Sequence, residues 1–65
     1  MQNTEPMLVT VEVNGKKYRL KLEIRKIGGY HVTCLEKSYL ATEGYDVEEA
    51  IAMGIDAIEF FDKDV

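Results

Sequence analysis

Few side chains in this sequence could take part in breaking a bond. The sequence contains one cysteine, Cys34, and one histidine, His31. These two residues can form neither an internal disulfide nor a structural zinc site. A two-metal nuclease needs several carboxylates around two divalent cations, yet only Glu12 and Glu23 fall within the first three expected strands. Both should project from the polar face, so we expect no catalytic residue, no metal ligand and no cofactor, and thus no enzyme.

Cys34 and His31 both have ordinary structural explanations. Cys34 could be a reactive thiol, but free cysteine is among the most buried residue types, and we expect a small core side chain. His31 could titrate near neutral pH or contact a partner. The simpler interpretation is a half-exposed histidine on the polar face of a strand.

The length of the chain predicts a single small domain that gains from association. A chain of 65 residues buries only about 60% of its unfolded surface, so we expect a homodimer or a higher homo-oligomer. No apolar run approaches the ~20 residues of a membrane span. The opening MQNTEPM lacks the pattern of a signal peptide, which makes a cytoplasmic protein the expectation.

Charge is divided unevenly along the sequence. Residues 1–33 contain six Lys or Arg against three acids, whereas residues 34–65 contain nine acids against two Lys, and the net charge is −4. Such polarity is typical of a protein that meets a charged surface. A solvated basic strand beside a solvated acidic helix would give the same pattern.

Residues 7–43 are expected to form an antiparallel sheet after a tail at residues 1–6. Asn14-Gly15 between two alternating runs is a strong hairpin signal, and pairing Val13 with Lys16 brings the apolar positions of both strands to one face. The second strand should continue to about Arg25.

A second turn should follow at Ile27-Gly28-Gly29, a three-residue loop whose odd length keeps Tyr30, Val32 and Cys34 on the core side. Residues 36–38 make a further turn, and a short fourth strand is expected from about Tyr39 to Glu43.

The last part of the sequence, residues 46–62, predicts one amphipathic helix. Asp46 should cap it, and Glu49 should complete a capping box. Gly54 lies in the middle of the buried side and indicates close approach of helix and sheet. The fold class is therefore α+β, with one helix packed on one face of a four-stranded meander. The expected buried positions are Val47, Ala50, Ile51, Gly54, Ile55, Ile58 and Phe61.

The segment GGYHVTCLEKSYLATEGYDVEEAIAMGIDAIEFF resembles the HicB-like antitoxin domain. The resemblance covers about residues 17–61 and depends on Gly28-Gly29-Tyr30, Thr42-Glu43-Gly44 and Glu48-Glu49-Ala50. It implies a truncated ribonuclease H-like fold and an antitoxin that binds and occludes a small basic RNase of the HicA type. The sequence departs from the family at residues 35–39, where a Pro-Asp-Leu-Pro-Gly turn is usual. Many members carry a DNA-binding segment after the helix; none follows here, so operator binding is not expected.

The polar face of the sheet offers a second interpretation. A basic row could hold phosphates of a nucleic acid, although Tyr18 and Tyr30 point to the other face and provide no stacking platform. A sheet with one covered face also needs a charged outer face. The residues of this candidate surface are Lys17, Arg19, Lys21, Arg25 and His31, with Lys16 nearby.

Three helix residues lie outside the expected buried side. Met53, Ala57 and Phe60 form a second apolar line, and exposed apolar patches tend to be contact sites. We expect an oligomer contact there, unless the N-terminal tail covers it. A stand-alone oligomeric domain with an unknown ligand is therefore the third interpretation.

Overall fold

The turn at Asn14 and Gly15 sets the register of the first two strands. The computed structural model describes residues 5–62, in which β1 (Met7–Val13) and β2 (Lys16–Ile24) pair antiparallel with Val13 opposite Lys16. Both turn residues have positive φ, 53° for Asn14 and 79° for Gly15, as a two-residue hairpin with the native twist requires. The predicted register is confirmed.

The loop between β2 and β3 (Tyr30–Cys34) is longer than predicted. Ile24 pairs with Tyr30, so five residues connect the strands rather than three, and β2 ends one residue before Arg25. The Arg25 N–H donates to the Gly29 carbonyl at 3.0 Å, which closes a tighter loop inside the connection. A Cβ on Gly29 would lie 2.7 Å from the Gly44 carbonyl oxygen. A side chain therefore does not fit at this end of the loop, and the odd loop length keeps the predicted faces.

The fourth strand begins later than predicted. β4 (Ala41–Gly44) pairs with β3, and Tyr39 belongs to the preceding turn. Leu40 is 1% exposed, and its N–H donates to the Lys37 carbonyl at 3.0 Å. Because the chain turns Leu40 into the core, regular pairing with β3 starts only at the next residue.

Helix α1 (Val47–Asp62) begins at the predicted cap. The Asp46 carboxylate accepts from the Glu49 N–H at 2.8 Å, and the Ala50 N–H donates to the Asp46 carbonyl at 2.8 Å. The Glu49 carboxylate accepts from the N–H of Tyr45 at 2.6 Å, one residue before the partner that a standard capping box uses. Three backbone donors around the helix start are therefore satisfied locally.

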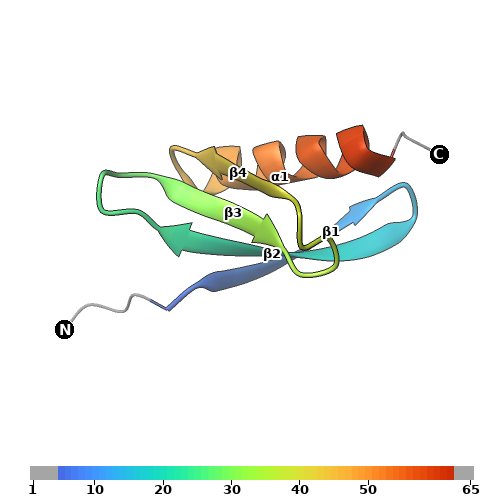
Figure 1. Ribbon diagram of the computed structural model, residues 1–65, viewed down its shortest axis with the longest axis horizontal. Coiled ribbons are helices and arrows are strands. Elements are labelled where there is room, and N and C mark those ends of the chain that lie inside the picture. The colour runs from blue at the N-terminus through green and yellow to red at the C-terminus, as the bar shows by residue number, and fades with distance from the viewer. Residues whose placement is uncertain (1–4, 63–65) are drawn as a thin grey trace.

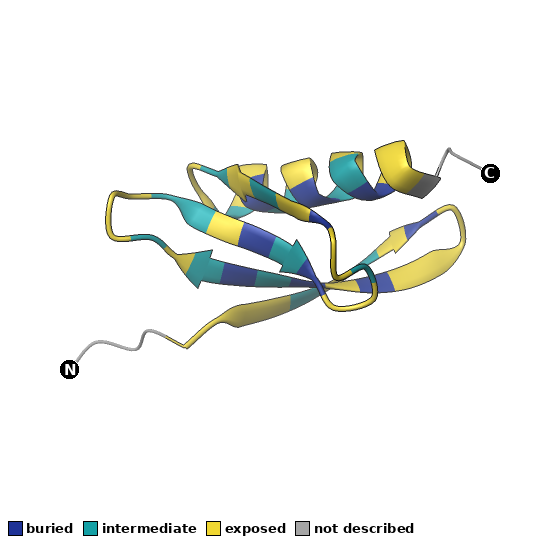
Figure 2. Cartoon of the chain, viewed as in Figure 1, coloured by how far each residue is buried: buried dark blue, intermediate teal, exposed yellow. Residues whose placement is uncertain are grey.

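The core lies between one face of the sheet and α1 (Figure 1). The sheet order is β1-β2-β3-β4, and α1 runs nearest to β4. The α+β architecture predicted from the sequence is thus confirmed, and Cys34 is a buried core side chain as expected. Figure 2 shows the buried positions alternating along the strands. The buried core residues are Val13, Tyr18, Leu20, Leu22, Val32 and Cys34 in the strands, Leu40 in the turn before β4, and Ala50 and Ile58 on α1.

Candidate functional site

An exposed apolar strip follows one side of α1. It consists of five large side chains, which we call the apolar strip: Tyr39, Tyr45, Met53, Phe60 and Phe61. At the C-terminal end of the helix, the Tyr39 and Phe61 rings meet edge to face with centroids 5.0 Å apart, and Phe60 and Phe61 lie 5.5 Å apart. Phe60 nevertheless remains 69% exposed. Large apolar groups left in water next to one another are typical of a contact surface.

Acidic residues alternate with this strip. Residues three and four apart are neighbours on a helix surface, so one side of α1 presents Glu49, Met53, Asp56 and Phe60 in turn. The adjoining outer side adds Glu48 and Glu59, both exposed. The side of α1 that faces away from the sheet therefore combines negative charge with exposed aromatic rings.

A shallow hollow lies at the N-terminal end of the apolar strip. It has a volume of about 350 Å³ and is lined by residues of the β2–β3 loop, the end of β4 and the first turns of α1, among them Gly29, Tyr45 and Met53. Its charged side chains are Arg25 and Glu43, which form an ion pair with each other, and Glu49, which accepts from the Tyr45 N–H. All three already have partners within the domain, so the hollow suits an uncharged side chain of a partner better than a charged ligand.

The predicted basic surface lies on the face of the sheet that α1 leaves uncovered, but its charges are partly neutralised. Arg19 forms an ion pair with Glu36 at 2.7 Å, and Arg25 pairs with Glu43. His31 is exposed between Glu23 of β2 and Glu43 of β4. Lys17 lies opposite Glu12, and only Lys21 has uncharged neighbours, Leu8 and Thr33, on both adjoining strands. The structure thus brings Lys17, Arg19, Lys21 and His31 to one face, with Arg25 in the adjoining β2–β3 loop, without making that face strongly positive.

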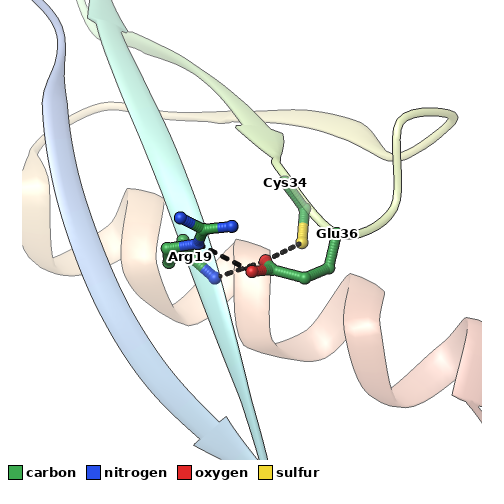
Figure 3. Close-up of polar contacts among 3 residues, drawn as sticks. All are labelled: Arg19, Cys34 and Glu36. Atoms are coloured by element: carbon green, nitrogen blue, oxygen red, sulfur yellow. Dashed lines mark hydrogen bonds and ion pairs between the residues drawn. The ribbon is translucent and has the colours of Figure 1, made fainter.

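Glu36 links the β3–β4 turn to β2 through two contacts with Arg19, and it also meets Cys34 at the end of β3 (Figure 3). One carboxylate oxygen accepts from the Arg19 backbone N–H at 2.8 Å, and the other accepts from the Arg19 Nε at 2.7 Å. The Cys34 Sγ lies 3.8 Å from the first oxygen. The backbone bond, followed by the side-chain bond, holds the pKa of the Glu36 carboxyl below its ordinary value. Glu36 stands in the segment where the sequence departs from the resembled family, and this bond anchors that segment to β2.

This bond makes the stability of the domain pH-dependent. The folded-state pKa of Glu36 is lowered, so its contribution is present above the unfolded pKa and is lost as pH falls through the folded pKa. We expect Glu36→Gln to lower the melting temperature at pH 7, with the difference from wild type shrinking to nothing in acid. Melting curves from pH 7 to pH 2 measure this.

Arg19→Met provides the control, because it removes the guanidinium and leaves the backbone N–H in place. Since the backbone bond is the first cause of the lowered pKa, a pH dependence should survive in Arg19→Met. Equal losses in the two variants would show that the ion pair, and not the backbone bond, carries the effect.

Of the three residues in the predicted oligomer contact, two are exposed and one is partly buried. Met53 is 39% exposed and Phe60 69% exposed, so both reach solvent as expected. Ala57 is partly buried and packs against the core. Phe61 was expected on the buried side of the helix, but it is 39% exposed and meets Tyr39 edge to face. The sequence did not single out Tyr39 and Tyr45 either, because their grouping with Met53 and Phe60 depends on where the β3–β4 turn lies relative to the helix end.

Comparison of the sequence with known protein families, with curated proteins and with solved structures finds no match. Among the described residues, no group of His, Cys, Asp and Glu could hold a metal ion, and no polar side chain is buried. No helix in the described part of the chain is long and apolar enough to cross a membrane.

Proposed function

We propose that this chain is a protein-binding domain of the HicB-like antitoxin type, which acts in the cytoplasm by binding rather than by catalysis. Its partner would be a small basic RNase of the HicA type, and inhibition would be steric occlusion of the RNase surface. The order of four antiparallel strands and one C-terminal helix is compatible with the truncated ribonuclease H-like arrangement that the sequence resemblance implies.

The observation that carries this proposal is the apolar strip with its acidic border. Binding energy in protein interfaces concentrates in a few large side chains, aromatic residues above all, and Phe60 and Tyr39 are available for this role. The acids on the same side, Asp56 and Glu59 among them, provide complementary charge for a basic partner, which speeds encounter and sets orientation.

The test is binding and inhibition of a HicA-type RNase with two substitutions on this side of α1. Phe60→Ala should weaken binding by about 30-fold, the equivalent of about 2 kcal/mol. Glu59→Lys should slow association, and its effect should shrink as salt is raised. Isothermal titration and stopped-flow kinetics measure the two effects, and RNA cleavage by the toxin measures inhibition.

Matched controls lie elsewhere on the surface. Ile27→Ala removes another exposed apolar side chain, which is 83% exposed in the β2–β3 loop, and Glu12→Lys makes the same charge change on the open face of the sheet. Both should leave binding and inhibition unchanged. A HicA-type RNase that is neither bound nor inhibited by the wild-type domain would refute the function. Inhibition that is unchanged by Phe60→Ala and Glu59→Lys would refute the role of the apolar strip and its acidic border in binding.

A nucleic-acid-binding scaffold is supported less well, because the two arginines of the basic surface are already ion-paired. This alternative function predicts a different experimental result. Salt-sensitive retention of RNA or DNA that disappears in the Lys17→Glu, Arg19→Glu double variant would favour that function over protein binding.

A further inference from the structure

Strand β1 is an edge of the sheet with no neighbour on its outer side in the described part of the chain. In an antiparallel pair, successive residues alternate between those that exchange backbone hydrogen bonds with the partner strand and those that do not. In a two-residue hairpin, the pair next to the turn, Val13 with Lys16, is the bonded one. The backbone N–H and C=O groups of Leu8, Thr10 and Glu12 therefore point to the free edge.

This edge lacks the features that usually prevent edge-to-edge pairing. Natural edge strands are short, or carry lysine, proline or a bulge, whereas β1 has seven residues, MLVTVEV, without any of these. The opposite edge, β4, has only four residues. Pro6, just before β1, has no N–H to offer and limits any pairing to Met7–Val13.

The apolar side of β1 is also incompletely covered. Val9 and Val11 are only partly buried, while their partners on β2, Leu20 and Tyr18, are buried. Met7 is 43% exposed, and on the other face Leu8 is 60% exposed. Helix α1 runs nearest to the β4 side of the sheet, and this explains why the cover thins out at β1.

We propose that β1 pairs antiparallel with β1 of a second copy of this chain, with Thr10 opposite Thr10 on a twofold axis. The result is a continuous eight-stranded sheet. In this register, all seven residues of β1 have a partner on β1 of the second copy. Shifting one strand by two positions would keep the apolar faces on the same side but would leave two residues of each strand unpaired. It sets Val9 opposite Val11 on the apolar face.

The register also explains why the strand that pairs with β1 comes from a second copy of this chain. Glu12 is the only charged residue of β1, and the twofold axis puts it opposite Leu8 of the other copy rather than opposite another acid. Leu8 and Glu12 are four positions apart, so the two Glu12 carboxylates are roughly 13 Å apart, beyond the Debye length at physiological salt. A strand pair of this length buries less area than a standard interface, so we expect a weak dimer with a Kd on the order of tens of micromolar.

The test uses opposite charges at Thr10. Within one copy, Thr10 is exposed and lies opposite Arg19, so Thr10→Glu gains a favourable neighbour and should fold normally. Across the axis, Thr10→Glu and Thr10→Lys each bring two like charges face to face, which destabilises a strand pair. Sedimentation velocity should show a concentration-dependent wild-type dimer, and each variant alone should raise the Kd at least ten-fold. An equimolar mixture of the two variants should restore dimerisation.

Thr33→Glu is the matched control, since it makes the same substitution on the same face opposite Lys21, away from the edge. It should leave the Kd unchanged.

Amide exchange of Leu8, Thr10 and Glu12 should slow with rising wild-type concentration. A wild-type chain that stays monomeric to about 1 mM, variants that dimerise as wild type does, or a mixture that stays monomeric would each overturn the proposal. Because the proposed dimer is formed by the free edge of β1 and not by the apolar strip, Phe60→Ala should leave it intact, and its outcome is independent of toxin binding.

Discussion

Gly44→Ala is expected to prevent stable folding. Gly44 ends β4, and a Cβ there would lie 2.5 Å from the Ala50 backbone N, 2.6 Å from the Ala50 Cα and 2.9 Å from the Glu49 carbonyl carbon. Real side chains do not approach backbone atoms so closely, so either the strand or the helix must move. Neither is free to do so, because Gly44 pairs with Tyr30 and the Ala50 N–H is bonded to Asp46.

The expected loss is about 3–5 kcal/mol, at the upper end of what overpacking costs. A domain of 65 residues has a total free energy of unfolding of roughly 3–10 kcal/mol. Gly44→Ala should therefore leave the chain largely unfolded, or close to unfolding, at 25 °C. Far-UV circular dichroism and urea unfolding measure the effect.

Gly28→Ala separates a steric clash from the loss of a flexible glycine. Gly28 has φ of +106°, and a Cβ there meets no atom within 4 Å, so its replacement costs only backbone strain of about 1–3 kcal/mol. If Gly44→Ala were no worse than Gly28→Ala, the helix start would not be as closely packed on β4 as the structure indicates.

The local features of this fold could be predicted from the sequence. Asn14-Gly15 and the alternating runs on both sides determine the first hairpin and its register, because a slip by one residue would mix the two faces. Asp46 determines the helix start through a bond to a residue three positions away. In each case the interaction that decides the structure lies within a few residues of the chain.

The features that could not be predicted depend on residues far apart. The β2–β3 loop was predicted too short because the space at Gly29 is limited by the Gly44 carbonyl, fifteen positions later in the sequence. Likewise, the neutralisation of Arg19 depends on Glu36, and the aromatic contact of Phe61 depends on Tyr39. The candidate surface was only half predicted for the same reason: periodicity finds Met53 and Phe60 on one helix, but not the loop residues beside them.

Leu20→Ala is the second substitution with a large expected effect. Leu20 is fully buried in the central strand β2, so removal of its side chain should cost about 2–5 kcal/mol. Its Cδ1 lies 2.6 Å from the position of a Cβ at Gly54, and its Cδ2 lies 3.1 Å from it. Helix and sheet therefore meet where a leucine fills the space that a helical side chain would otherwise occupy.

This complementarity predicts a strong coupling between the two positions. Gly54→Ala alone gains about 1 kcal/mol of helix propensity but overpacks against Leu20, which costs about 1–3 kcal/mol, so a net loss of about 1 kcal/mol is expected. In Leu20→Ala the new methyl group has room, so the overpacking disappears and the propensity gain remains. Gly54→Ala should thus change from destabilising to stabilising, with a coupling energy of about 1–3 kcal/mol.

Urea unfolding of the double-mutant cycle measures this coupling, and Leu20→Val replaces Leu20→Ala if the latter does not fold. Leu22→Val with Gly54→Ala is the matched control, since the three atoms nearest to a Cβ at Gly54 all belong to Leu20 and none to Leu22. A cycle with Leu20 that is additive would mean that α1 lies farther from the sheet than described. Because this close contact turns the glycine side of α1 inward, it also determines that the acidic residues and the apolar strip face outward, where a partner can reach them.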